Sequence, residues 1–349
     1  MEKILFIHTH KLDGTSGGDK RTLQAIAGLK TYFDVDLYSC YKPANKLKGL
    51  LRNILFYSGM MTKNDSNLIL EKIVKDDIKA VFLDSSLHGK LAAKIKKENL
   101  NVKIIINYHN NEKKYYHDMF KTNGLPYYLV YLSAKYNENL SKEYGDFHVF
   151  ISDEDRQSMN VNGEAITIPA TLKDNYKKSE KTINEESYVL FLGSAFFANI
   201  NAGEFIIRNI APFINKKFYI VGSGMSKVFP DEYKNVKIFD FVPLLNDIEN
   251  GACAFVSPVF TGSGAKIKIA EALMYGKKII GTPLSFNGYR FDEMIAEKCC
   301  TSEDFINAIN KLDSSKLFYK ENRDCFVKYY SDENNTKYYK QIADFIRIG

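Results

Sequence analysis

The amino-acid sequence predicts an α/β protein made of two doubly wound parallel sheets in tandem. The chain has 349 residues, and a domain usually holds about 100–200 residues, so two domains are expected. Short apolar runs alternate with longer amphipathic stretches, which is typical of parallel strands joined by helices. The alternation occurs twice, because a polar and weakly periodic stretch over residues 160–187 interrupts it.

The apolar runs predict the strands of both halves. In the first half the expected strands are 3–8, 35–39, 80–83, 103–108, 147–152 and 165–168. In the second half they are 188–193, 217–221, 236–239, 254–257 and 278–281. Helical patterns are expected at 20–32, 66–76, 88–98, 126–144, 201–215, 244–250, 265–275, 303–310 and 335–348.

These patterns divide the chain into a first domain over 1–168, a linker over 169–187 and a second domain over 188–329. A terminal helix within about 330–349 could pack back on the first domain. Ligands of open α/β sheets bind beyond the carboxyl ends of the strands. With two such halves facing each other, the cleft between them is the expected site.

Composition excludes several classes of protein. The net charge is +6 without a long Lys/Arg run, which argues against a nucleic-acid partner. The five cysteines form no CxxC pair, so neither a zinc site nor a disulfide framework is expected. No apolar run reaches the ~18 residues of a spanning helix, and the N-terminus does not resemble a signal peptide. We therefore expect a cytoplasmic location, with room for peripheral contact at the inner face of a membrane.

The strongest local feature is a strand, a glycine loop and a helix in succession between Ser257 and Thr282. Such a loop presents backbone N–H groups at a helix N-terminus, where anions bind, and its glycines admit a ligand close to the backbone. Lys266, expected in the first helical turn, adds a positive charge suited to a pyrophosphate. The loop residues are Gly262, Ser263, Gly264 and Ala265.

Glu271 is an acidic residue in an otherwise apolar helix. A helix that is apolar nearly all round is usually buried, and a ribose diol would supply the hydrogen-bond donors that a carboxylate needs there. Alternatively, Glu271 lies on the one exposed stripe and pairs with Lys268 three residues earlier. The preceding glycine loop favours the functional interpretation.

This segment resembles the donor motif of the GT4 family of retaining GT-B glycosyltransferases, in members that read G-x-G-x-K-x-K-(I/V)-x-E-A-(L/M). The glycines that end two earlier strands, Gly193 and Gly222, fit the same pattern. The resemblance implies the GT-B fold, with Glu271 on the donor ribose and the loop of Ser263 to Lys266 against the pyrophosphate and the sugar.

Two departures from the family pattern concern the donor. Many members carry a glutamate eight residues before Glu271, where this chain has Ser263. Many also place Arg and Lys in the loop after the first strand of the second domain, where residues 194–201 hold no cation. Lys266 and Lys268 remain as cations for the diphosphate, and we favour Lys266 because it is nearer the expected helix start.

In the first half, His109 follows an expected strand and resembles the family histidine that contacts the transferred sugar. The other interpretation of this segment is a capped loop in which Asn110 or Asn111 starts a helix. The loop after the first strand resembles the glycine-rich first loop of GT-B enzymes, although a lone Gly-Gly is a weak motif. From these segments we expect Gly17 and Gly18 at the donor, and Asp19, Arg21 and Glu112 on the acceptor side.

Residues 46–61 are apolar and basic without an acidic residue. Such a segment could lie on an anionic bilayer, or it could be a core helix with a solvated basic edge.

The reaction implied by the resemblance is sugar transfer, with retention, from a nucleoside diphosphate sugar to a glycan or lipid-linked acceptor in surface polysaccharide or glycoconjugate synthesis. A UDP-sugar is favoured, His109 and Lys266 are the expected catalytic residues, and neither a cofactor nor a metal is expected. Two rival functions remain: a catalytically silent homologue that acts as a binding or stabilising subunit, and a GT-B sugar-nucleotide epimerase.

Overall fold

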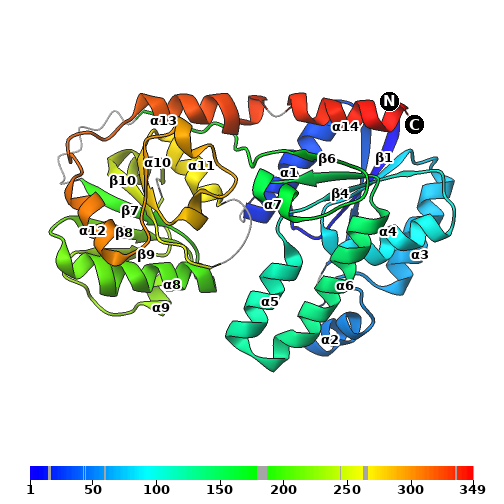
Figure 1. The fold of residues 1–349 in the computed structure, drawn as a ribbon, viewed down its shortest axis with the longest axis horizontal. Helices are drawn as coiled ribbons and strands as arrows, with labels where there is room; N and C mark the ends of the chain where they lie inside the picture. The colour runs from blue at the N-terminus through cyan, green and yellow to red at the C-terminus, as the bar shows by residue number, and fades with distance from the viewer. Residues whose placement is uncertain are drawn as a thin grey trace. The chain divides into compact units, whose positions relative to one another are not determined.

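A computed structural model describes residues 1–14, 17–41, 43, 45–58, 60–178, 187–243, 245–261, 266–334 and 336–348. The chain divides into two compact units (Figure 1). The first comprises Met1–Ala170 together with Asn335–Gly349, and the second comprises Thr171–Asn334. Residues 171–178 of the predicted linker therefore belong to the second unit.

The first unit contains a six-stranded sheet in the order β2-β1-β3-β4-β5-β6, and all neighbouring strands are parallel. Its strands are β1 Lys3–His8, β2 Asp34–Ser39, β3 Ala80–Leu83, β4 Lys103–Asn107, β5 Phe147–Phe150 and β6 Glu164–Thr167. Successive residues of the central strands enter two different cores. Leu5 and Ile7 belong to one core, and Ile4 and Phe6 belong to the other.

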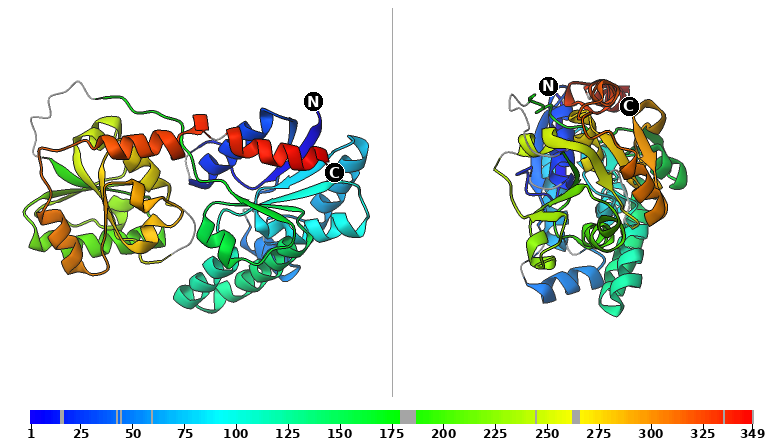
Figure 2. Two further views of the ribbon diagram at one scale, coloured as in Figure 1. Left: turned by 45° about the horizontal axis from the view of Figure 1, so that its top comes forward. Right: turned by 90° about the vertical axis from the view of Figure 1, so that its left-hand side faces the viewer.

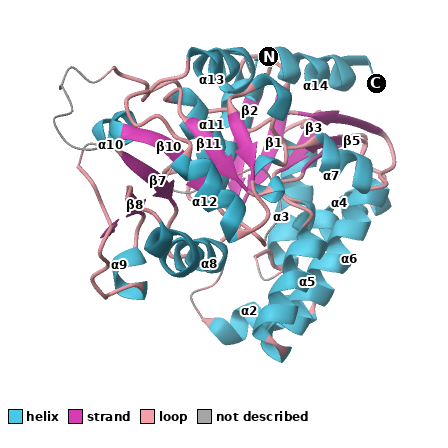
Figure 3. Cartoon of the chain, turned by 60° about the vertical axis from the view of Figure 1, so that its left-hand side comes forward, coloured by secondary structure: helices cyan, strands magenta, loops and turns pink. Residues whose placement is uncertain are grey.

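Helices cover both faces of this sheet, as the colouring by secondary structure shows (Figure 3). One core includes residues of α3 Lys63–Lys75 and α4 Gly89–Lys97. The other includes residues of α1 Gly17–Lys30 and α14 Thr336–Ile348. The remaining helices of the unit are α2 Lys46–Ile54, α5 Glu112–Asn123, α6 Tyr128–Tyr144 and α7 Asp153–Ser158.

The last helix, α14, packs against the first helix, α1, so the two ends of the chain lie near each other (Figure 2). Their approach depends on Gly28, where a Cβ atom would stand 2.1 Å from the ring of Tyr339. Tyr339 is buried in the same core as Phe6.

The second unit has a six-stranded sheet in the order β12-β11-β10-β7-β8-β9, again entirely parallel. Its strands are β7 Tyr188–Leu192, β8 Lys217–Val221, β9 Val236–Phe239, β10 Ala252–Ser257, β11 Lys278–Gly281 and β12 Ala296–Lys298. Its helices include α8 Phe197–Phe205, α9 Met225–Val228, α10 Leu245–Gly251, α11 Ile267–Met274, α12 Ser302–Asn310 and α13 Lys320–Cys325. The predicted class, two doubly wound α/β sheets, is confirmed.

Several predicted boundaries are corrected. Helix α11 begins at Ile267, and Lys266 is its N-cap residue with φ −89° and ψ 97°. The helix expected at 201–215 begins at Phe197 and ends in a π-helical turn, Ile206–Ile210, and a 3₁₀ turn, Ala211–Phe213. Strand β12 was not predicted, because its three residues form no apolar run.

Candidate functional site

The strand order of each sheet places a ligand site without reference to any motif. From β7, the chain of the second unit first adds β8 and β9 on one side, and then β10, β11 and β12 on the other. Ligands of doubly wound sheets bind at the carboxyl ends of the strands where the order reverses. In the second unit that switch point lies between β7 and β10. In the first unit it lies between β1 and β3.

The loops after β7 and β8 are in tight contact at the second unit's switch point. A Cβ atom on Gly222 would stand 1.9 Å from the carbonyl oxygen of Gly193, and one on Gly193 would stand 2.7 Å from Cγ of Asn199. The backbone N–H of Ala195 donates to the carbonyl of Ser223 at 2.8 Å. Gly193 and Gly222 are thus required for the packing of these loops.

Lys268, on α11, reaches the first turn of α8, the helix that follows the loop after β7. Its ammonium donates to Asn199 Oδ1 at 2.8 Å and lies 4.4 Å from the ring centroid of Phe191. Asn199 in turn donates from Nδ2 to the carbonyl of Ser194 at 3.0 Å. Burial lowers the pKa of Lys268 to about 7, although Glu271 opposes the shift. A cation therefore stands beside the loop that has none of its own.

Lys266 lies just before α11, not within its first turn as expected. The expectation that it lies in the first helical turn is wrong, since the helix starts one residue later. Tyr289 Oη donates to its backbone carbonyl at 2.9 Å, which ties the residue to the segment after β11. Its side chain is half-buried.

Glu271 is half-buried on α11, between residues that are fully buried. Ile269, Ala270, Ala272 and Leu273 are each at most 1% exposed. The neighbouring Lys268 turns its ammonium to Asn199, and the two charges remain close enough for Glu271 to act on the pKa of Lys268. The preceding loop residues Gly262, Ser263, Gly264 and Ala265, all predicted to bind the donor, lie outside the described residues.

In the first unit, Asp84 organises the residues at the carboxyl ends of β3 and β4. Its fully buried carboxylate accepts hydrogen bonds from Thr22 Oγ1 and from Asn107 Nδ2 at 2.7 Å. His109 Nε2 lies 3.0 Å from Asp84 Oδ1. Burial alone would raise the pKa of Asp84, but His109 and the hydrogen bonds outweigh it, so the pKa is lowered. The result is an ionised carboxylate that orients His109.

His10 lies beside this pair. The ring centroids of His10 and His109 are 5.2 Å apart, and His10 Nδ1 lies 3.4 Å from Asp19 Oδ1. Burial, and then the neighbouring His109, lower the pKa of His10. Gly18 leaves room for the ring, because a Cβ atom there would stand 2.2 Å from His10 Cε1.

The three residues expected on the acceptor side are buried, and Asp19 is 5% exposed. Arg21 is 2% exposed, and its Nη1 donates to Gln24 Oε1 at 3.1 Å and to the carbonyl of Pro169 at 3.0 Å. Glu112 is 7% exposed at the start of α5. These side chains are largely enclosed within the first unit, and their assignment to the acceptor side stays a prediction.

The capped-loop interpretation of the His109 segment also holds. Asn111 is the N-cap of α5, and its Oδ1 accepts from the N–H of Lys114 at 3.0 Å. This cap, three residues after Tyr108, fixes the start of α5 at Glu112, and Tyr108 is buried directly after the end of β4. The loop between strand and cap is therefore short, and it holds His109 against Asp84.

Sequence reasoning missed three residues of these sites: His10, Asp84 and Asn199. Asp84 and His10 each follow a predicted strand, so their place at the carboxyl ends of β3 and β1 was a usable signal. Asn199 carried no such signal, because its partner Lys268 is remote in sequence and meets it only through the fold.

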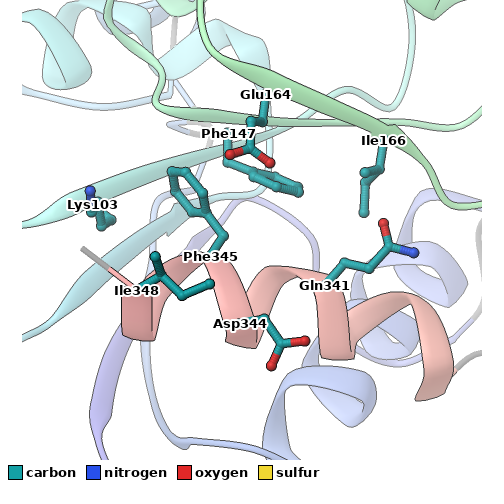
Figure 4. Close-up of a pocket in the computed structure, with 8 residues that line it drawn as sticks. All are labelled: Lys103, Phe147, Glu164, Ile166, Gln341, Asp344, Phe345 and Ile348. Atoms are coloured by element: carbon teal, nitrogen blue, oxygen red, sulfur yellow. The ribbon is translucent and has the colours of Figure 1, made fainter.

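A cavity of about 500 Å³ lies elsewhere in the first unit. Figure 4 shows α14 side chains on one side of it and residues of β4, β5 and β6 on the other. Its lining includes Lys103, Phe147, Glu164 and Phe345. None of the predicted site residues lines it, so it is distinct from the candidate sites.

Comparison with known proteins relates part of the chain to glycosyltransferases. A family model described as glycosyl transferases group 1 matches residues 186–314. An uncharacterized 44.6 kDa protein in the cps region of Klebsiella pneumoniae is 23% identical over 206 residues, which are 53% of this chain and 52% of that protein. The match thus spans about half the length of that relative.

Two solved structures share the fold. Sucrose-phosphate synthase from Thermosynechococcus elongatus superposes with a TM-score of 0.74 at 13% identity over 100% of both chains. HepE of Anabaena, in complex with UDP and glucose, superposes with a TM-score of 0.67 at 12% identity over 99% of this chain and 100% of its own. At such identities the likeness concerns the fold alone.

Proposed function

We propose that this chain transfers a sugar from a nucleoside diphosphate sugar to an acceptor hydroxyl. The proposal rests on the match of the second unit to the group 1 glycosyltransferase model and on the GT-B fold. The observation that carries the proposal is Lys268 at the switch point of the second sheet, held by Asn199 beside the loop after β7. The similarity to HepE, which was solved with UDP and glucose, favours a UDP-sugar.

In this proposal the second unit holds the donor. Glu271 accepts hydrogen bonds from the ribose hydroxyls, and Lys268, together with Lys266, neutralises the diphosphate. Charge accumulates on the diphosphate as the sugar–phosphate bond breaks. Fixed positive groups stabilise that charge without reorganisation, which is usually the largest contribution to catalysis of this kind. The assignment needs no metal ion.

His109 is proposed to contact the transferred sugar. Its Nε2 lies 3.0 Å from the carboxylate of Asp84, which accepts a proton from that nitrogen, and in the tautomer that is protonated on Nε2 alone Nδ1 is an acceptor. An acceptor nitrogen of this kind suits a sugar hydroxyl. Asp84 is then a positioning residue, which fixes the tautomer and the orientation of the ring.

The acceptor is proposed to be a glycan or a lipid-linked saccharide, and the configuration at the transferred sugar to be retained. The cps region of the Klebsiella relative supports a role in polysaccharide or glycoconjugate synthesis. Retention follows the GT4 resemblance, and ¹H NMR of the product's anomeric proton tests it.

Replacing Glu271 tests the donor site. Glu271→Ala should weaken UDP binding by about 1.5–3 kcal/mol, the usual range for a hydrogen bond to a charged group, as measured by calorimetry. Glu303→Ala, at an exposed acidic residue of α12 in the same unit, is the matched control. Unchanged affinity in Glu271→Ala would refute the ribose role. UDP binding without any transfer, across a panel of UDP-sugars and acceptors, would favour the catalytically silent homologue.

We also propose that α2 contacts an anionic membrane surface. The core-helix interpretation of this segment is wrong, because Leu47, Leu51, Ile54 and Leu55 are exposed. No acidic residue occurs from position 40 to 64. Arg52 uses its Nη1 for the carbonyls of Tyr41 and Met60, so it also braces its own segment. Within the described residues no helix is long and apolar enough to cross a bilayer.

Vesicle co-sedimentation tests this contact. Binding should require anionic lipid, fade as salt screens the charges, and fall in the double variant Leu51→Gln, Leu55→Gln. The matched control is Leu68→Gln, Val74→Gln, which changes two exposed apolar residues of α3. Equal binding by both double variants, or none by the unmodified chain at low salt, would exclude α2 as the membrane contact.

A further inference from the structure

Three potential metal ligands meet at the switch point of the first unit. His10, Asp84 and His109 follow β1, β3 and β4, and one ligand atom from each lies within 4.8 Å of the other two. The strand order β2-β1-β3-β4 makes these three loops neighbours. Nothing in the proposed transfer reaction uses His10, so the cluster calls for an explanation of its own.

The ligand groups are oriented by a surrounding set of hydrogen bonds. Both carboxylate oxygens of Asp84 are engaged, one by Thr22 and the other by Asn107. Asp19 lies next to Nδ1 of His10, which leaves Nε2 as the nitrogen for a ligand. A carboxylate behind a histidine is a common outer partner at metal sites, because it fixes the tautomer and raises the basicity of the ring.

The geometry suits an ion of moderate size. Zn–N and Zn–O bonds of about 2.0–2.2 Å separate neighbouring ligand atoms by about 3.0–3.5 Å. Asp84 Oδ1 and His109 Nε2, at 3.0 Å, already stand at that separation. His10 has to close the remaining gap, and its side chain is 30% exposed, so a side-chain rotation is open to it.

We propose that His10, Asp84 and His109 form a reversible binding site for a divalent transition-metal ion such as Zn²⁺. Two imidazoles and one carboxylate suit Zn²⁺, Co²⁺ or Ni²⁺, whereas Mg²⁺ and Ca²⁺ prefer sites made of oxygen ligands alone. Three protein ligands leave at least one coordination position for water, as in sites with an open position. Partial exposure of His10 gives the ion a route from solvent.

Binding of the ion would change how His109 meets the sugar, because a neutral ring bound to the metal through Nε2 carries its proton on Nδ1, the nitrogen proposed to accept from the sugar. The metal takes Nε2 and so replaces the bond to Asp84, and it fixes the ring in a new environment. If His109 contacts the transferred sugar, the ion inhibits transfer. This second step rests on the proposed function, whereas the binding of the ion does not.

Cobalt titration of the metal-free chain tests the binding. The Cys300→Ser variant is the background, because Cys300 is an exposed thiol that could itself bind cobalt or zinc. We expect one Co²⁺ per chain with visible d–d absorption, displaced by Zn²⁺. In that background, His10→Ala should raise the dissociation constant at least about tenfold, and His117→Ala, which removes a histidine outside the cluster, should leave it unchanged.

Two further measurements keep the test decisive if His10→Ala is poorly folded. Circular dichroism and urea unfolding report whether His10→Ala folds, and zinc-edge X-ray absorption of the otherwise unmodified background should show two imidazoles at about 2.0–2.1 Å. The proposal is overturned by an absence of saturable one-to-one binding, by equal affinity in His10→Ala, or by a spectrum without two imidazoles.

Inhibition is measured separately. Zn²⁺ should inhibit transfer reversibly, and His10→Ala should need at least about ten times more zinc for the same inhibition. Transfer without any cobalt binding would leave the proposed function intact and remove the metal site. Cobalt binding by a chain that transfers no sugar would leave the metal site intact and remove the proposed function.

Discussion

Lys268→Met is expected to weaken UDP binding and to remove most of its pH dependence. Lys268 is the cation that the structure places beside the loop after β7, through its 2.8 Å bond to Asn199. A hydrogen bond to a charged group contributes about 1.5–3 kcal/mol, and half-burial limits the screening by solvent. The dissociation constant for UDP should therefore rise by about 10- to 150-fold.

The pH dependence follows from the lowered pKa of about 7. The ammonium is present below pH 7 and is lost above it, so the affinity for the anionic diphosphate should fall as the pH rises from 7 to 9. The protonated fraction of the free chain falls about tenfold for each pH unit above the pKa. Lys268→Arg keeps its charge throughout this range, because a guanidinium does not deprotonate.

Calorimetric titration with UDP at several pH values between 6.5 and 9 measures these effects. The ionisation of UDP itself contributes equally to all three proteins, so the differences between their pH profiles isolate Lys268. The affinity of the unmodified chain for UDP should fall across this range. The affinity of each variant should change much less with pH. Affinity within twofold of the unmodified chain in Lys268→Met, or three parallel profiles, would refute the assignment.

Three other predictions concern metal dependence and stability. Sugar transfer should persist in excess EDTA, and a complete loss restored by added metal would contradict the proposed neutralisation by lysines. Gly28→Ala should lower the free energy of unfolding by about 1–3 kcal/mol, because the new methyl meets the ring of Tyr339; urea denaturation measures this change, and equal stability would show that α14 readily moves aside. Lys277→Met should lower the free energy of unfolding by about 1–3 kcal/mol in the same assay, because the buried ammonium donates to the carbonyls of residues 250, 252 and 317. Lys311→Met, at an exposed lysine, is the control.

Most of the fold was predictable because buried parallel strands are nearly continuous apolar runs. Strands β1, β3, β8, β9 and β11 begin and end at the predicted residues. The sequence of β12, Ala-Glu-Lys, carries no such run, and only its pairing with β11 makes it a strand. The start of α8 at Phe197 was missed because Phe196 and Phe197 extend the apolar pattern of the preceding loop.

The sites were predictable only in part, for a physical reason. A motif names residues close in sequence, such as Lys266 and Glu271, whereas hydrogen bonds join residues that the fold brings together. Asp84 accepts hydrogen bonds from Thr22 and Asn107 and lies beside His109. Thr22 lies in α1, Asn107 ends β4 and His109 follows β4. Arg21 was expected at the start of a helix, but α1 begins four residues earlier, at Gly17, and Arg21 is buried with its guanidinium donating to the carbonyl of Pro169.

Lys266 and Lys268, in the segment expected to bind the donor, show how a small error in a helix boundary changes which lysine is assigned to the diphosphate. With a helix starting at 265, Lys266 would be the cation nearest the N-terminus, and Lys268 would point elsewhere. The helix starts at Ile267, so Lys266 lies outside the helical turn and Lys268 occupies its second position. From that position its ammonium crosses the ring of Phe191 to Asn199, which belongs to the helix after the cation-free loop. The positive charge that the resemblance places on the loop after β7 is therefore supplied, in this chain, from the opposite side of the switch point.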